Sequence, residues 1–325
     1  MQVSVIMPCH NAADWIGAAL SSVASQTRAP LEIIVIDDDS TDNSREVVEN
    51  TRPQLEKCGI AVVLLKTKVH NAGAARNVGI KAAQGDWIAF LDADDIWYPH
   101  HLENADALLK STNAVAFMAN HHFLSGQDIS EIPPEMRARL EQASANLSHI
   151  DYVKMAQQGF HFGHSTVLIK RARAIEVGLF DETQTRRHDI DLWLRALQDQ
   201  TWAYHPVPAA QYRVDTPGSI SKSMISCEYF YLRALLKNRA GYPHQAMEEL
   251  LSKSARKLMS LSFVDGQSND FKRARDIAWP LLSAFHRLFY VGARLCQPAF
   301  QGAIRLKRAW VWRGHKTSTS KAPSP

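Results

Sequence analysis

The sequence predicts an α/β fold in which helices flank a mostly parallel sheet, followed by a C-terminal helical extension. Strands alternate with helices over about the first hundred residues, acidic clusters directly follow two of these strands, and only helical patterns remain after about Cys227. Strands and helices that alternate at this spacing form right-handed βαβ units and a parallel sheet. The 325 residues, 46% hydrophobic and 22% charged, have a globular composition and suffice for one large or two modest domains.

Four short apolar runs near the N-terminus predict the first strands, because each is rich in Val, Ile or Leu and ends at Pro, Gly or acidic residues. The runs cover residues 3–8, 31–36, 60–66 and 87–91. Helical periodicity covers residues 15–23, with Asn11 as the expected N-cap. A second helix is predicted from about Asp42, with an interruption near Pro53, and a helix of small residues covers 71–85.

Acidic clusters follow the second and fourth predicted strands: Asp37 to Asp39, and then Asp92, Asp94 and Asp95. Ligands of open α/β sheets bind outside the carboxyl ends of the strands, so both clusters are expected at one ligand-binding edge. Neighbouring carboxylates repel each other. A hard cation such as Mg²⁺ or Mn²⁺ offsets that repulsion and takes further ligands from phosphate oxygens. The D-x-D spacing alone is more often a solvated acidic turn, but the second cluster favours a ligand site.

The second half of the chain is predicted to hold strands and helices in a less regular order. A helix is expected to follow Pro99, and residues 186–199 are expected to form another helix that opens on a charged motif. Strands are predicted over residues 114–120 and 164–171. Residues 209–221 are predicted to begin as a strand and to end in a Pro-Gly turn. Residues 131–160 carry mixed signals and support no assignment.

Several classes of protein are excluded by what the sequence lacks. None of the cysteines stands in a C-x-x-C pair, so neither a zinc site nor a disulfide framework is indicated, and reduced thiols fit a cytosolic location. No run of eighteen apolar residues is present, so no membrane-spanning helix is expected. The chain enters an apolar strand at Val3, so no signal peptide is expected. Neither of the Gly-rich nucleotide-binding motifs, G-x-G-x-x-G and the P-loop, occurs.

The C-terminal segment is strongly basic while the rest of the chain is acidic. Residues 272–325 hold eleven Lys or Arg residues against the single acid Asp276, so that the net charge of +4 hides a positive tail. Residues 277–312 mix Trp, Phe and Leu with Arg and Lys, which is typical of a segment lying on an anionic membrane surface. A helical cap on the preceding domain is the alternative. No nucleic-acid partner is expected, because no known binding motif accompanies the charge.

Five segments occur along the chain in this order: VSVIMPCHN, EIIVIDDDSTDNS, NAGAARNVGIKAAQGDWIAFLDADD, VGLFDE and HDIDLWLR. Together they resemble the family-2 inverting glycosyltransferases of the GT-A fold, of the bacterial cell-surface polysaccharide type. The likeness covers roughly residues 1–225. The resemblance implies a Rossmann-like, mostly parallel sheet flanked by helices.

The resemblance also implies how the chain is divided. Residues 1–110 would form the nucleotide-sugar-binding half of the catalytic domain, and residues 111–226 its acceptor-binding half. Residues 227–312 would form the helical extension with the potential to associate with a membrane. Residues 313–325 are polar, contain Pro and Ser, and are predicted to be disordered.

Nucleotide-binding residues follow from the resemblance position by position. Asp38 matches the aspartate that hydrogen-bonds the nucleobase, Pro8 a residue lining the base pocket, and Arg76 a basic residue near the nucleotide. Asp92 is expected to contact the ribose or the metal shell, and Asp94 to coordinate the metal directly. Each has a structural alternative: Asp38 as a helix cap, Pro8 as a strand terminator, and Arg76 as a partner of the acidic clusters.

The resemblance implies a divalent cofactor, Mn²⁺ or Mg²⁺, that bridges both phosphates and stabilises the charge of the leaving nucleoside diphosphate. Inversion by a single displacement also needs a base for the acceptor hydroxyl. Asp189 matches the family's base, with His188 in place of the usual Glu and Asp191 as the fallback. Capping the helix that follows is the alternative role for Asp189, and the two roles do not exclude each other. Asp39 stands where the family usually has Gly or Asn.

The sequence therefore predicts a metal-dependent inverting glycosyltransferase. It would move a sugar from a nucleoside-diphosphate sugar, UDP-linked by family habit, to a glycan or lipid-linked glycan. We expect it in the cytoplasm, peripherally on the inner face of the cell membrane. A catalytically inactive sugar- or nucleotide-binding scaffold of the same fold is the main alternative. A D-x-D phosphohydrolase with Asp92 as nucleophile is a further one, although two βα units precede the motif here.

Three tryptophans offer a possible sugar-stacking surface, although aromatic residues in amphipathic segments more often belong to a core. They are Trp97, Trp193 and Trp202.

Overall fold

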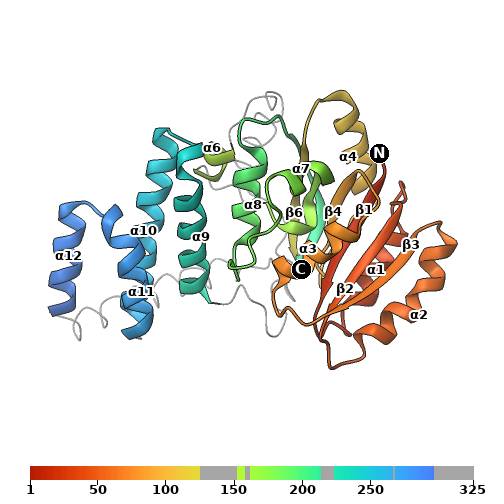
Figure 1. The fold of residues 1–325 in the computed structure, drawn as a ribbon, viewed down its shortest axis with the longest axis horizontal. Helices are drawn as coiled ribbons and strands as arrows, with labels where there is room; N and C mark the ends of the chain where they lie inside the picture. Colours follow the sequence, from red (N-terminus) through yellow and green to blue (C-terminus); the bar gives the residue numbers. More distant parts are fainter. Residues whose placement is uncertain (125–151, 158–161, 214–222, 266–267, 296–325) are drawn as a thin grey trace, which may run out of the picture.

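A computed structural model describes residues 1–124, 152–157, 162–213, 223–265 and 268–295 (Figure 1). The chain has the GT-A fold, in which helices flank a curled, mixed sheet. The strands of the described sheet follow the order β3-β2-β1-β4-β7-β6-β8-β5. They are β1 Val3–Cys9, β2 Glu32–Asp38, β3 Ala61–Thr67, β4 Trp87–Phe90, β5 Ile96–Trp97, β6 Ala116–Leu124, β7 Val167–Lys170 and β8 Ala203–Arg213.

Helices cover both faces of the sheet and continue into the extension at one end of the molecule (Figure 1). Those around the sheet are α1 Ile16–Ala24, α2 Ser44–Lys57, α3 Ala72–Ala82, α4 His101–Ser111, α6 Tyr152–Gln157, α7 Arg171–Glu176 and α8 His188–Leu197. Those of the extension are α9 Met224–Asn238, α10 Gln245–Asp265, α11 Ser268–Ala278 and α12 Ala284–Leu295. Among these described helices, none is both long and apolar enough to cross a membrane.

The arrangement of the first four strands brings the two acidic clusters to one edge. β1 lies between β2 and β4 and pairs in parallel with both. In this register Cys9 at the end of β1 is the partner of Asp37, while β4 ends two residues before Asp92. The carboxyl ends of β2 and β4 therefore flank that of β1, which confirms the expectation that both clusters lie at one edge of the sheet.

Alternate strand residues fill two cores, one on each face of the sheet. Val5 and Ile33 belong to the cluster packed with α1 and α2, whereas Ile6, Ile34 and Phe90 face α3 and α8. Each such side chain removed from water contributes about 1.5–3 kcal/mol. The hydrophobic core that contains Ile6, Ile34 and Phe90 continues without a break into α9, α10 and α12. The extension therefore shares a core with the domain that it follows.

Two local expectations are wrong. Asn11 has a φ of 50° and does not cap α1; its side-chain oxygen accepts a hydrogen bond from the Thr41 amide at 2.9 Å. It therefore joins two loops at the edge of the sheet. Pro53 does not interrupt α2, which runs from Ser44 to Lys57 with Pro53 on its exposed side. Packing of Leu55, which is fully buried, keeps the helix in place despite the lost backbone hydrogen bond.

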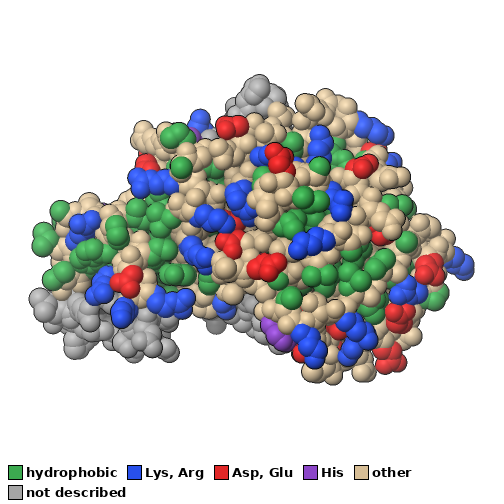
Figure 2. Space-filling model, in the orientation of Figure 1, with side chains coloured by type: hydrophobic (Ala, Val, Ile, Leu, Met, Phe, Trp, Pro, Cys, Tyr) green, Lys and Arg blue, Asp and Glu red, His purple; other side chains and the backbone are tan. Residues whose placement is uncertain are grey.

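The extension is attached to the rest of the chain by specific contacts. The Tyr242 hydroxyl donates to the Leu194 carbonyl of α8 at 2.8 Å. Within the extension, the Ser254 hydroxyl of α10 donates to the Glu228 carboxylate of α9 at 2.6 Å. At the far end, hydrophobic side chains gather around α12 (Figure 2). The predicted disordered tail, residues 313–325, lies outside the described residues.

The three tryptophans belong to the core rather than to a sugar-stacking surface. Trp97, Trp193 and Trp202 are 3%, 0% and 2% exposed. The indole nitrogen of Trp97 donates to the Ser165 carbonyl at 2.6 Å, which holds the turn before β7 against the sheet.

Candidate active site

Asp38, at the end of β2, braces the loop that follows β3. Its carboxylate accepts hydrogen bonds from the backbone amides of Val69 at 2.7 Å and Asn71 at 3.1 Å. Asn71 in turn caps α3, accepting from the Ala74 amide at 3.0 Å. Pro8 lies on the neighbouring strand, paired with Ile36 and partly exposed at the same edge. The two residues predicted for the base pocket therefore lie on neighbouring strands at the same edge of the sheet.

The negative charge of Asp39 at this edge is partly compensated by a neighbouring lysine. Asp39 is partly exposed, with a φ of 63°, and its carboxylate lies 3.1 Å from the Lys68 ammonium. The hydrogen bond from Lys68 is the main reason that the pKa of Asp39 lies below its usual value. The departure from Gly or Asn at this position is therefore accompanied by a local counter-charge.

Arg76 joins the D-x-D segment to the HDID motif. This arginine of α3 is buried, and its guanidinium donates to the Asp92 carboxylate and to Nε2 of His188, the latter at 2.8 Å. Because a guanidinium has no acceptor, Nε2 of His188 must accept, which leaves the imidazole proton on Nδ1. Burial, helped by His164 and Arg76, holds the pKa of His188 well below its usual value, so the ring is neutral. Arg76 pairs with the acidic cluster, as its structural alternative expected.

Asp95 braces the D-x-D segment instead of facing the ligand edge. Its buried carboxylate accepts from the Ser165 hydroxyl at 2.5 Å and from the Arg213 amide at 2.9 Å. The Ser165 oxygen also accepts from the Asp92 amide at 3.1 Å, and the Arg213 side chain donates to the Asp94 carbonyl at 3.2 Å. Burial, reinforced by Asp92 and Asp94, raises the pKa of Asp95 well above its usual value. The segment is therefore held in place from two sides.

The carboxylates at this edge suit a metal ion whose ligands come partly from the protein and partly from a substrate. Within the described ranges, no three His, Cys, Asp or Glu side chains are grouped so that they could hold an ion by themselves. Asp92 and Asp94 remain partly exposed, while Asp95 is withdrawn into the core. Mg²⁺ and Mn²⁺ are commonly bound by one or two carboxylates together with phosphate oxygens, and this donor set matches that pattern.

Asp189 lies in the first turn of α8 with its carboxylate at the edge of a cluster of buried rings. Its side chain is 13% exposed, and one oxygen lies 3.9 Å from Nδ1 of His164. The N-cap of α8 is Arg187, at a φ of 53°, so Asp189 does not cap the helix. Burial raises the pKa of Asp189, and Arg187 is the main group that opposes this. A mostly buried carboxylate that keeps some exposure and has a raised pKa is suited to accept a proton.

Asp191, the fallback base, is fully buried and engaged. Its oxygens form ion pairs with Arg195 at 2.7 Å and Lys237 at 3.1 Å, and accept a hydrogen bond from the side-chain amide of Asn238 at 3.1 Å. Lys237 and Asn238 belong to α9, so this network fastens α8 to the extension. The carboxylate has no access to an incoming hydroxyl, and the geometry favours Asp189 over Asp191.

We expect Asp191→Ala to destabilise the protein by about 3–5 kcal/mol, because it leaves Arg195 and Lys237 without their buried partner. Urea unfolding followed by circular dichroism measures this. Asp189→Ala is the matched control and is expected to show no comparable loss, since burial disfavours its charge. Equal stability of the two variants would contradict the structural role of Asp191.

The VGLFDE segment is clamped to α3 by Asn77. The Asn77 side chain exchanges two hydrogen bonds with the backbone of Phe180, both at 2.9 Å, and donates to the Glu182 carboxylate at 3.0 Å. This clamp places the ring of Phe180 beside Arg76, whose guanidinium lies 5.9 Å from the ring centroid. The predicted motifs therefore meet through direct contacts.

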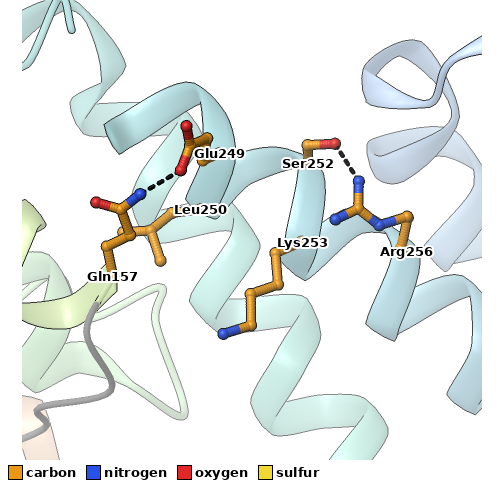
Figure 3. Close-up of a pocket in the computed structure, with 6 residues that line it drawn as sticks. All are labelled: Gln157, Glu249, Leu250, Ser252, Lys253 and Arg256. Carbon is orange, nitrogen blue, oxygen red and sulfur yellow. Dashed lines mark hydrogen bonds between the residues drawn. The ribbon is translucent and has the colours of Figure 1, made fainter. Parts of the chain in front are cut away.

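A separate pocket lies between α6 and α10 (Figure 3). Its volume is about 370 Å³. Gln157 donates to Glu249 across it, Arg256 donates to Ser252 at 2.6 Å, and Lys253 extends into the space between them. None of its residues belongs to the D-x-D or HDID motifs, so this pocket is distinct from the candidate active site.

Comparison with known proteins identifies the family. The model of the family described as glycosyl transferase family 2 matches residues 4–175, slightly more than half of the chain. The chain belongs to glycosyl transferase family 2. The glycosyltransferase AmsB of amylovoran biosynthesis in Erwinia amylovora is 30% identical over 82% of this chain and 86% of its own length.

A second relative matches a shorter part of the chain. WfgD of Escherichia coli, a β-1,3-glucosyltransferase named for UDP-glucose and an α-D-GlcNAc-diphosphoundecaprenol acceptor, is 38% identical over 39% of this chain. The chain spans about half or less of the length of the first relatives that it matches. Among solved structures, TarS of S. aureus with UDP-GlcNAc has a TM-score of 0.66 at 17% identity, covering 94% of this chain and 92% of that one. This likeness shows the GT-A fold.

Proposed function

We propose that the protein is a metal-dependent inverting glycosyltransferase. It would transfer a sugar from a nucleoside-diphosphate sugar, UDP-linked in our proposal, to a glycan or lipid-linked glycan. The observation that carries the proposal is the buried contact of Arg76 with both Asp92 and His188. Through this contact, the residues proposed for the donor and the base Asp189 belong to one site.

The donor is proposed to bind along the edge formed by β1, β2 and β4. Pro8 would line the base pocket, and Asp38 would contact the nucleobase from its place at the end of β2. Arg76 is already paired, so we propose that it orients Asp92 toward the ribose and the metal shell, rather than serving as a free phosphate ligand. Asp94 would be the main protein ligand of Mn²⁺ or Mg²⁺, with phosphate oxygens completing the shell.

When bound, the metal supplies charge stabilisation for the leaving diphosphate. The chain's own contribution is to position the carboxylates, which Ser165 and Arg213 hold through Asp95. On the acceptor side, Asp189 would take the proton of the attacking hydroxyl as the new bond forms at the anomeric carbon. The neutral His188 accepts a hydrogen bond from Arg76, which also donates to Asp92, so His188 joins the two halves of the site without adding a charge beside Asp189.

The acceptor class is proposed from the relatives. AmsB is named for amylovoran biosynthesis, and WfgD for an α-D-GlcNAc-diphosphoundecaprenol acceptor. A glycan or lipid-linked glycan is therefore the acceptor that we propose. An enzyme acting on such an acceptor would work in the cytoplasm and peripherally at the inner face of the membrane.

Product analysis tests this function. The protein is incubated with nucleotide sugars, Mn²⁺ and saccharide acceptors, and the released nucleotide is identified by chromatography. Nucleoside diphosphate together with a lengthened acceptor supports transfer. Pyrophosphate would indicate nucleotidyl transfer, inorganic phosphate a phosphohydrolase, and no product a binding scaffold; each of these results would overturn the proposal.

We expect the transfer rate to fall at acidic pH, because the base acts only when it is deprotonated. Burial raises the pKa of Asp189, so the fall begins at a higher pH than for an exposed aspartate. Arg187 opposes this rise, and Arg187→Gln should therefore move the acidic limb of the pH–rate profile to still higher pH. Lys57→Gln, an exposed change at the end of α2, is the control and should leave the profile unmoved. A profile that does not respond to Arg187→Gln would remove Asp189 as the titrating group.

A further inference from the structure

One face of α12 is both apolar and exposed. Phe285, Leu288 and Val291 are 74%, 72% and 49% exposed, and their spacing of three residues places them along one side of the helix. Over the described ranges, few other large hydrophobic side chains are exposed, and those are scattered over several elements. In Figure 2 hydrophobic side chains are grouped at this end of the molecule, with Lys and Arg beside them.

The opposite face of α12 is firmly packed. Tyr290 is 6% exposed, and its hydroxyl donates to the Arg256 carbonyl at 2.9 Å and lies 2.8 Å from the Ser260 hydroxyl. Arg287 donates to the carbonyls of Trp279 and Pro280 at 3.2 and 3.1 Å. α12 is therefore attached to α10 through Tyr290, while the side chains of its apolar face remain exposed.

Basic side chains lie on α11, the helix that precedes α12 in the sequence, at the same end of the molecule (Figure 2). Lys272, Arg273 and Arg275 are all exposed. Arg273 lies 4.9 Å from the ring of Tyr229 and Arg275 is 3.2 Å from Asp276, so one acid offsets only part of the charge. A second copy of the chain would bring its own basic α11 side chains to the same place, and like charges repel. An anionic surface is the occupant that complements both the charge and the apolar side chains.

We propose that α12, with the basic side chains of α11, docks on an anionic membrane surface. Phe285, Leu288 and Val291 would enter the boundary between headgroups and acyl chains, while Lys272, Arg273 and Arg275 contact lipid phosphates. Within residues 277–312, one side of α12 would then be the part that enters the membrane. The inference rests on the proposed function only because a lipid-linked acceptor would be met at such a surface.

Vesicle sedimentation tests the proposal with the full chain. We expect binding to vesicles that contain phosphatidylglycerol, much weaker binding to vesicles of phosphatidylcholine alone, and release by salt. Phe285→Ser combined with Leu288→Ser should weaken binding by about tenfold or more, since both side chains leave the acyl boundary. Val207→Ser is the matched control, because Val207 is 56% exposed on β8 and lies outside this face.

Three results would overturn the proposal. The first is a native chain that does not sediment with anionic vesicles, and the second is a double variant that binds as well as the native chain. In light scattering without lipid, a native dimer that becomes a monomer in the double variant would make a second copy the occupant. Calorimetric binding of UDP to the same variants is measured in parallel. Because that readout needs no lipid, a failure of the membrane proposal is distinguished from a failure of the donor site.

Discussion

Replacing Asp189 by Asn is expected to reduce sugar transfer by about 10²–10⁴-fold while leaving donor binding unchanged. A positioned general base contributes a factor of this size, and the amide cannot accept the acceptor's proton. The change keeps the size of a side chain that is 13% exposed, so the fold should be preserved. Initial rates with saturating donor and acceptor measure the loss, and calorimetry with UDP measures donor affinity.

Asp181→Asn is the control for this variant, because the Asp181 carboxylate pairs with Lys237 at 2.8 Å on the side of α9. It removes one carboxylate from the same segment without touching the proposed base. Near-normal turnover in Asp189→Asn would contradict the assignment and move the base elsewhere in the site.

Replacing Asp94 by Ala is expected to weaken metal-dependent donor binding by roughly a hundredfold or more, about 2.8 kcal/mol at 1.4 kcal/mol per tenfold. The fold should survive, because this segment is held by the Asp95 carboxylate, the Ser165 hydroxyl and the Asp94 carbonyl, all of which remain in the variant. Calorimetric titration of UDP with and without Mn²⁺ measures the effect.

Asp86→Ala is the matched control for the Asp94 variant. It removes an exposed carboxylate at the opposite end of the same strand, β4, and should leave donor affinity as it is. If Asp94→Ala binds UDP as tightly as the native chain in the presence of Mn²⁺, the metal assignment fails. Equal weakening in both variants would indicate a general loss of negative charge rather than a lost metal ligand.

The fold was accessible to sequence reasoning because it rests on local patterns. Apolar runs and helical stripes in alternation define βαβ units, and the parallel pairing of β1 with β2 and β4 then brings both acidic clusters to one edge. The local errors came from tertiary contacts. Asn11 binds the Thr41 amide across two loops, and α2 continues through Pro53 because its apolar side is buried.

The bracing of the site could not be read from the sequence. Ser165 contacts Asp92 and Asp95 from about seventy residues away, and Arg76 reaches His188 across more than a hundred. No spacing rule links such positions. The choice between Asp189 and Asp191 did leave one signal: Asp191 and Arg195 are four residues apart on a helix, a spacing that favours an ion pair and a structural role.

Calorimetric titration of a panel of nucleoside diphosphates, each with and without Mn²⁺, tests the central claim most directly. The account predicts that one nucleotide, UDP in our proposal, binds to the edge formed by β1, β2 and β4, and that binding requires the metal. Absence of binding across the whole panel, in the presence of metal, would contradict a nucleotide-sugar site built on Asp38, Asp92 and Asp94.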